Sequence, residues 1–269
     1  MRIAVALQTP EVTRNVPVCL FTGTFEERLA KAARAGAQGV ELMTVEPARL
    51  DPARLRGQVE SAGLEVAAVG SGAVAFAAGL TLLAADEEVA AAARERLREL
   101  LAFAAAIGAP LLTIGSFRGW SGGDRYAERV LGDMLALEAA GSSVVVVLEM
   151  LNRYESDLLN DCAAGLQFLS VEGRERLRLL LDTYHMNVEE RSPAEALRSA
   201  MRAGALRHVH IGDSNRLPPG RGHIDFAALV GVLRDGGYNG WLSAELLAKP
   251  DPDTAGQETV AYLRKLLAE

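Results

Sequence analysis

Four strand-like runs in the second half of the chain end in side chains that could bind a metal ion. Residues 144–149 form an apolar run, mostly valine, that ends in Glu149, and three later runs end in or carry Asp182, His210 and Glu245. Such runs are typical of strands buried on both faces. An ionised carboxylate at the end of a buried strand is costly unless a cation meets it there. Two glutamates, one aspartate and one histidine therefore indicate a divalent metal site in an enzyme.

The charge of this set also favours a cation. The four side chains would carry about three negative charges, and like charges that close would keep one carboxyl protonated unless a divalent ion offsets them. A single glutamate at a strand end is usually solvated or caps a helix, but four such endings at one face are better explained by a bound ion. Oxygen ligands with one imidazole suit Mn²⁺, Mg²⁺ or Co²⁺ better than a thiolate-type zinc site. His208 would point the same way as His210, and we expect it to pack beside the site, with a direct role as the alternative.

Strand and helix signals alternate along the whole chain. The candidate strands are residues 3–7, 39–43, 65–70, 111–116, 144–149, 177–183, 206–212 and 240–246. The helix signals are a capping box at Thr24–Glu27 with a stop at Gly36, Asp51-Pro52 with a stop at Gly63, periodic segments at 86–107, 124–139, 156–169 and 253–267, a capping box and proline at Ser192–Glu195, and Asp225 with a stop at Gly236-Gly237.

Eight strands with helical crossovers predict an α/β fold, a single (β/α)8 TIM barrel over residues 1–269. A doubly wound open sheet is disfavoured because no Gly-x-Gly-x-x-Gly follows the first strand. In such barrels the active site lies at the carboxyl ends of the strands, where the four candidate ligands fall.

Bulk composition excludes several classes of protein. A net charge of −7 argues against a nucleic-acid partner, and the chain has no apolar run long enough for a membrane span. The N-terminus lacks the long apolar region of a signal peptide. Cys19 and Cys162 lie far apart and have no metal-ligand spacing. We expect two reduced thiols in a cytoplasmic protein.

The chain resembles the xylose-isomerase-like barrel superfamily. Within it, the closest group is the ketose 3-epimerases (D-tagatose and D-psicose 3-epimerases) and related sugar-phosphate isomerases and epimerases. The matching segments are Glu149-x-Leu-Asn-Arg-Tyr-Glu155, Asp182-Thr-Tyr-His185-Met-Asn187, His208-x-His210-Ile-Gly-Asp-Ser-Asn-Arg216, Pro219-Gly-Arg-Gly-His223 and Ser243-Ala-Glu245.

The resemblance implies a role for each matching residue. The residues matching Glu149, Asp182, His210 and Glu245 hold one divalent ion in that family, usually Mn²⁺. The two glutamates handle the C3 proton from opposite faces of the sugar, through an enediolate. Residues matching His185 and Arg216 hold the oxygens near C1 and C2, and the one matching Glu155 also binds the sugar. The partner implied is a free or phosphorylated sugar, and family members are often dimers or tetramers.

Three further residues bear on the substrate. Arg221 lies in the loop after the seventh strand, where barrels of this class often cradle phosphate, so it is either a clamp for a phosphate or carboxylate or a solvated arginine. Trp120 is either a pocket wall or a plain loop aromatic. Glu41 lies in the second strand and is a candidate substrate contact. Met150 and Asp213 stand where proline and glutamate are common in the family, which leaves the particular sugar open.

Other functions on the same scaffold stay open. A hydroxypyruvate-type aldose–ketose isomerase or an inosose isomerase/dehydratase would use the same metal and carboxylates. An enzyme like endonuclease IV would need a histidine-rich multi-zinc cluster and a basic face, which the four histidines and the net charge of −7 disfavour. A non-catalytic sugar-binding barrel should have lost one of the two acid–base glutamates.

Overall fold

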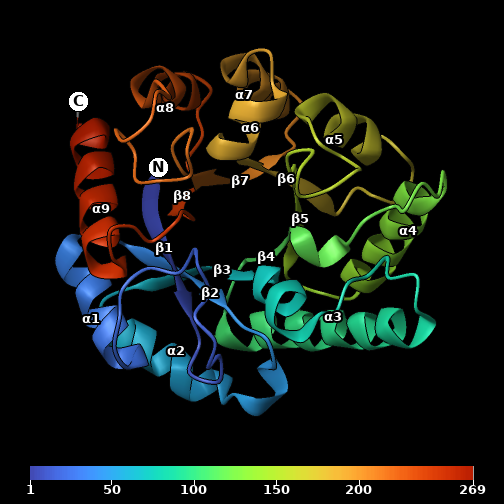
Figure 1. Cartoon of the computed structure of the whole chain (residues 1–269), viewed down its shortest axis with the longest axis horizontal. Helices are drawn as coiled ribbons and strands as arrows, with labels where there is room; N and C mark the ends of the chain where they lie inside the picture. The colour runs from blue at the N-terminus through green and yellow to red at the C-terminus, as the bar shows by residue number, and fades with distance from the viewer. Residues whose placement is uncertain (269) are drawn as a thin grey trace.

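Eight parallel strands form a closed barrel in the computed structural model, which describes residues 1–268 (Figure 1). The strands are β1 (Arg2–Gln8), β2 (Gly39–Met43), β3 (Glu65–Gly70), β4 (Leu111–Ile114), β5 (Val145–Glu149), β6 (Leu177–Asp182), β7 (Leu206–Ile211) and β8 (Trp241–Ala244). Each strand pairs with the next, and β8 pairs with β1 through Trp241 opposite Arg2. The predicted TIM barrel is confirmed. Residue 269, the last of the predicted single domain, lies outside the described residues.

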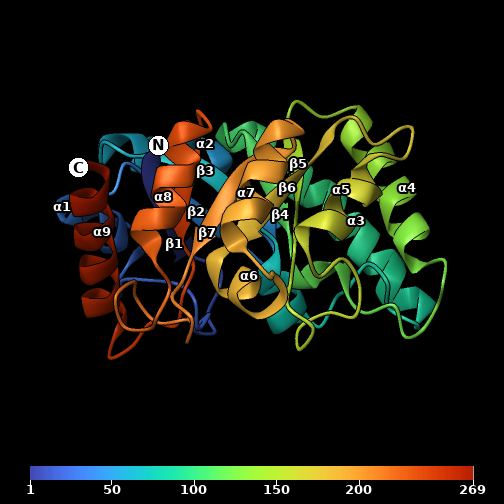
Figure 2. The same ribbon diagram turned by 90° about the horizontal axis from the view of Figure 1, so that it is seen from above.

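Helices surround the barrel as an outer ring, with α9 beside α1 near the C-terminus (Figure 1). They are α1 (Phe25–Ala35), α2 (Pro52–Ser61), α3 (Glu87–Ile107), α4 (Ala127–Ala140), α5 (Cys162–Leu169), α6 (Thr183–Glu189), α7 (Pro193–Arg202), α8 (Phe226–Asp235) and α9 (Pro252–Ala268). Three short turns are η1 (Pro47–Arg49), η2 (Val74–Ala78) and η3 (Ser116–Arg118). The view turned by 90° shows the helices packed along the outside of the strands (Figure 2).

Most predicted helix ends are confirmed. Thr24 and Glu27 form a reciprocal capping box, and Gly36 ends α1 with a φ of 98°. Asp51, Asp86 and Asp225 cap their helices as N-cap acceptors. Ser192 also caps α7, but no return bond from Glu195 accompanies it, and the Glu195 carboxylate bonds Arg198 instead.

Two helix boundaries were wrong, and one helix was missed. The helix predicted from residue 156 begins only at Cys162, because the buried Ser156 hydroxyl bonds within the preceding loop and Asp161 is the N-cap. The helix predicted from residue 124 begins at Ala127, because Asp124 forms a side-chain turn with Tyr126. The missed helix is α6, which follows β6 directly and is capped by Asp182.

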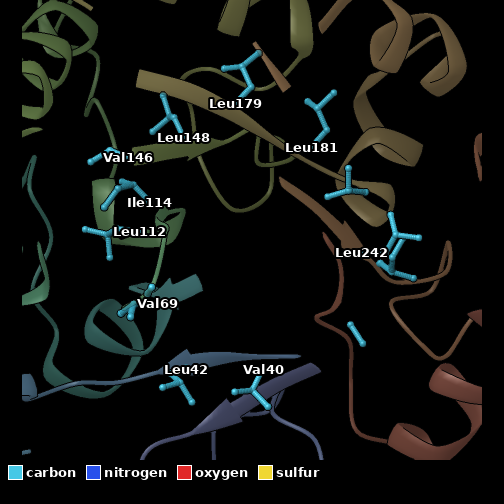
Figure 3. Close-up of a cluster of buried hydrophobic side chains, with 14 of the residues drawn as sticks. Val40, Leu42, Val69, Leu112, Ile114, Val146, Leu148, Leu179, Leu181 and Leu242 are labelled. Carbon is cyan, nitrogen blue, oxygen red and sulfur yellow. The ribbon is translucent and has the colours of Figure 1, made fainter. Parts of the chain in front are cut away.

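Alternation along each strand decides which residues enter the barrel. Outward-facing residues form the main apolar core between strands and helices, and Figure 3 labels ten of them around the ring of strands. Their neighbours face inward, where Ala68, Leu111, Val147 and Leu180 pack together. Glu149 continues the inward face of Val147, and Asp182 that of Leu180.

The described chain offers no membrane-spanning segment: none of the helices within residues 1–268 is long and apolar enough. Cys19 and Cys162 are free, buried thiols, as expected. Cytoplasmic location stays a prediction.

Candidate metal centre

The four predicted ligands meet at the carboxyl ends of β5 to β8. Glu149 is the last residue of β5, Asp182 the last of β6, and Glu245 follows β8 directly. His210 lies opposite Asp182 in the pairing of β6 with β7. One ligand atom from each of the four residues lies within 4.8 Å of all the others, and all four residues are buried. The structure therefore places the predicted set together, in one layer of the barrel interior.

His210 stands at the centre of this cluster. Its Nδ1 atom lies 3.2 Å from Oε2 of Glu245, 3.3 Å from Oε1 of Glu149 and 3.9 Å from Oδ2 of Asp182. Burial disfavours the charged imidazole, but the carboxylates of Glu41 and Glu245 outweigh it and raise the pKa of His210 well above its usual value. Three carboxyls thus converge on one side of a single imidazole.

The donor set fits a divalent cation. Oδ1 of Asp182 accepts the N–H groups of Tyr184 and His185 and so caps α6, whereas the buried Oδ2 has no hydrogen-bond partner. Burial, together with Glu245, raises the pKa of Glu149 to about 7. Burial also raises the pKa of Asp182 to about 6, against the opposing effect of His210 and Arg216. These raised pKa values mean that the carboxyls stay partly protonated, and Oδ2 of Asp182 is left without a partner. A bound cation would favour the ionised carboxylates and contact the unpartnered oxygen.

These pKa values predict how ion binding depends on pH. Because the pKa values of Glu149 and Asp182 lie above their usual range, the ion-free protein keeps protons there that an ion must displace. Affinity should therefore fall as pH falls below 7, and the Kd for Mn²⁺ should be about 100-fold weaker at pH 5.5 than at pH 7.5. Calorimetric titration at both pH values, in buffers of different ionisation enthalpy, checks the affinity and the protons released. Equal affinity at both pH values would refute this description of the site.

His185 is set as a neutral hydrogen-bond donor beside the cluster. Its Nδ1 accepts the backbone N–H of Asn152 at 3.2 Å and lies 2.7 Å from that residue's side-chain nitrogen. Burial, and then Arg216, lowers the pKa of His185 well below its usual value, so the ring is neutral. The proton therefore lies on Nε2, which is buried, has no hydrogen-bond partner and lies 3.7 Å from Oε1 of Glu149. A substrate oxygen near Glu149 would find this donor free.

Arg216 lies beside Glu245, at another side of the cluster. Its Nη1 donates to Oε1 of Glu155 at 2.9 Å, and its Nη2 lies 3.6 Å from Oε2 of Glu245. Burial alone would lower its pKa, but Glu245 and Glu155 raise it, so the guanidinium stays charged. The backbone of Arg216 has a φ of 59°, in the left-handed region. Three predicted residues, Glu155, Arg216 and Glu245, are thus linked by direct contacts.

Asp213 holds the loop that carries Arg216. The buried Asp213 carboxylate accepts backbone N–H groups from Ser214, Gly220, Gly222 and Ile224, all within the loop after β7. The Arg216 N–H also donates to the Asp213 carbonyl at 2.7 Å. A Cβ on Gly222 would come within 2.2 Å of Oδ1 of Asp213, so only glycine lets the backbone wrap this carboxylate. The loop is organised around an internal anion.

Arg118 was missed by sequence reasoning. This fully buried arginine donates from Nη1 to the Glu149 carbonyl at 2.5 Å and from Nε to the Ser156 hydroxyl at 3.3 Å. Burial lowers its pKa to about 10. It ties the turn after β4 to the end of β5 that presents Glu149. Only its place in the segment after the fourth strand hinted at a role.

Three residues with open roles are now placed. Glu41 is fully buried and hydrogen-bonded to His208 and His210, so it adjoins the four candidate ligands and is removed from solvent. Trp120 is 50% exposed in the loop after β4. Arg221 forms a two-bond ion pair with Glu258 of α9, and both side chains are exposed.

Comparison with known proteins extends over almost the whole chain. The family described as xylose isomerase-like TIM barrel matches residues 29–266. An L-ribulose 3-epimerase of Mesorhizobium japonicum is 33% identical over 256 residues, which cover 91% of this chain and 82% of the relative. A solved structure of L-ribulose 3-epimerase superposes with a TM-score of 0.81 at 28% identity, over 99% of this chain and 94% of that one. A D-allulose 3-epimerase from Methylomonas sp. in complex with D-allulose has a TM-score of 0.78 at 25% identity, over 98% and 97%.

Proposed function

We propose that this chain, which belongs to the xylose isomerase-like TIM barrel family, is a metal-dependent ketose 3-epimerase. Membership confirms the resemblance found in the sequence motifs. The observation that carries the proposal is the meeting of Glu149 and Glu245 at one imidazole, between a neutral His185 donor and the Arg216 guanidinium. The relatives named above are ketose 3-epimerases, which supports the same chemistry.

One divalent ion would be held by Glu149, Asp182, His210 and Glu245. We propose Mn²⁺, with Mg²⁺ or Co²⁺ as alternatives, because oxygen ligands with one imidazole suit these ions. The ion supplies Lewis-acid stabilisation of negative charge on the oxygens of a ketose.

The acid–base work falls to the two glutamates. One carboxylate takes the C3 proton of the ketose, and the other returns a proton to the opposite face, which inverts that carbon. Their environments differ: burial raises the pKa of Glu149 to about 7, whereas His210 and Arg216 overcome burial and lower the pKa of Glu245. A pair with separated pKa values can start with one member protonated and the other ionised.

The neighbouring donors stabilise the enediolate that forms between the two transfers. His185 presents a preorganised Nε2–H, fixed by Asn152 on the far side of the ring. Arg216 presents its guanidinium, held by Glu155. Donors that are already oriented need no rearrangement when negative charge appears on the substrate oxygens.

We further infer that the ketose is not phosphorylated. In the loop after β7, where many barrels bind phosphate, four backbone N–H groups already donate to the Asp213 carboxylate. Arg221, the proposed clamp, is paired with Glu258. A phosphate would have to displace the Asp213 carboxylate from these N–H groups, the Glu258 carboxylate from Arg221, or both.

A substrate panel tests the proposal. L-Ribulose, D-psicose, D-tagatose and D-fructose, each free and phosphorylated, should be assayed with added Mn²⁺. We expect epimerisation of free ketoses, a kcat/KM at least about tenfold lower for the phosphates, and no change in either value for Arg221→Ala. Equal use of both forms, with loss of the phosphate activity alone in Arg221→Ala, would restore the clamp hypothesis. Aldose products without epimers would favour the aldose–ketose isomerase alternative. Assembly into a dimer or tetramer stays a prediction that sedimentation velocity tests.

A further inference from the structure

A second buried cluster lies against the metal centre and has no part in the mechanism above. The Glu41 carboxylate is fully buried, and its Oε2 lies 2.9 Å from Nε2 of His208 and 3.1 Å from Nε2 of His210. Its Oε1 lies 3.2 Å from the same His210 nitrogen and accepts from the Thr113 hydroxyl at 3.3 Å. One carboxylate thus contacts two imidazoles and a hydroxyl, and all four residues are buried.

The strands explain this convergence. Glu41 faces inward from β2, Thr113 from β4 and His208 from β7, and His208 precedes His210 by two residues on the same face of the strand. The two imidazole rings meet edge to face, with centroids 5.1 Å apart. The cluster therefore lies one layer deeper in the barrel than the metal ligands.

We propose that Glu41 is a positioning residue for the metal centre: it accepts the Nε2–H of His210 and so leaves Nδ1, which faces Glu149, Asp182 and Glu245, as the ring nitrogen that binds the ion. An ionised carboxylate can only accept hydrogen bonds, so a neutral His210 must carry its proton on Nε2. A metal-binding histidine commonly depends on such an outer acceptor for its tautomer and ring orientation. The ring of His210 would otherwise be free to present an N–H to the cation.

His208 completes the arrangement as a second donor to Glu41. Its Nε2–H engages Oε2, while its buried Nδ1 has no hydrogen-bond partner. A second cation among Glu41, His208 and His210 is the competing interpretation, because their ligand atoms also lie within 4.8 Å of one another. That cation would take the Nε2 lone pair of His210, and a neutral ring would then direct N–H toward the first cluster. The geometry favours a single ion in the first cluster, with the Glu41 carboxylate orienting its histidine ligand, His210.

The inference rests on the metal centre of the proposed function and is tested without any sugar. The Kd for Mn²⁺ should be measured by calorimetric titration for the intact chain, Glu41→Ala, Glu41→Gln and Thr113→Val, after thermal melting has shown which variants fold. We expect Glu41→Ala to bind Mn²⁺ about 10–100-fold more weakly. Glu41→Gln keeps one acceptor oxygen and should fall between Glu41→Ala and the unmodified chain. The stoichiometry should stay at one ion per chain.

Thr113→Val is the matched control, because it removes a contact to the same carboxylate in the same layer without touching His210. It should bind Mn²⁺ within about twofold of the unmodified chain. The proposal is overturned if both Glu41 variants that fold bind Mn²⁺ as tightly as the unmodified chain, or if Thr113→Val weakens binding as much as they do. Two ions per chain, reduced to one by the Glu41 variants, would establish the competing second site. A chain that binds Mn²⁺ as expected yet epimerises no ketose would refute the proposed function alone.

Discussion

Replacing Glu245 with glutamine is expected to lower epimerisation by about 10²–10⁴-fold, the usual contribution of a general acid–base group, while the sugar still binds. Glutamine preserves the size of the side chain and one oxygen that can face an ion, but its amide cannot take up or return a proton. The change should therefore appear in kcat far more than in KM. Steady-state kinetics at saturating Mn²⁺, with ligand binding followed by calorimetry, checks both parts.

Glu258→Gln is the control for this variant. Glu258 is an exposed glutamate on α9 that pairs with Arg221 and is not one of the candidate ligands. It should leave kcat and KM unchanged. Glu149→Gln should lose kcat as Glu245→Gln does, because in the proposed mechanism each carboxylate handles one face of C3. Near-normal turnover in Glu245→Gln would remove this residue from the proton transfer.

Removing the divalent ion should abolish turnover and also weaken the fold. Without a cation, Glu149, Asp182 and Glu245 face one another around His210, and only protons and the Arg216 guanidinium offset their charge. An ion present at 100 times its Kd stabilises the folded chain by about 2.7 kcal/mol, which corresponds to roughly 5–10 °C in Tm for a chain of this size. Treatment with a chelator, followed by assay and thermal melting, measures both effects.

Adding Mn²⁺ back to the stripped protein should restore turnover and Tm together. His210→Asn provides the comparison, since it removes the only imidazole from the cluster and should reduce the shift in Tm on Mn²⁺ addition. Full turnover after complete removal of the ion would contradict the metal-dependent mechanism. A Tm that does not respond to the ion would place metal binding elsewhere than in this folded site.

The barrel and the meeting of its four candidate ligands could be predicted because their signals are local. An apolar run such as residues 144–149 indicates a buried strand, and parallel strands bring their carboxyl ends to one face of the barrel. Glu149, Asp182, His210 and Glu245 therefore fall together once the fold is known. The pairing of His185 and Arg216 with this site came from the resemblance of their segments to a family.

The remaining contacts depend on closure of the barrel and on loop conformation. Glu41 meets His208 across 167 positions of sequence, and no pattern near either residue shows that they share a layer. Asp213 captures backbone N–H groups of its own loop, and side-chain identity does not show where these groups point. The sequence around Arg118 gives no sign that the folded chain buries this residue against Glu149. Helix α6 has no clear sequence signal because it is short and follows its strand directly, and its N-cap, Asp182, is also a candidate ligand.

Solvent deuterium tests the central claim most directly. The Mn²⁺-loaded protein should be incubated in D₂O with a ketose that the panel shows to be a substrate, and the label located by NMR. If one of Glu149 and Glu245 removes the C3 proton and the other returns a proton derived from solvent, each newly formed epimer should carry deuterium at C3 and none at C1. Deuterium at C1 alone, or epimers formed without any label at C3, would contradict the account.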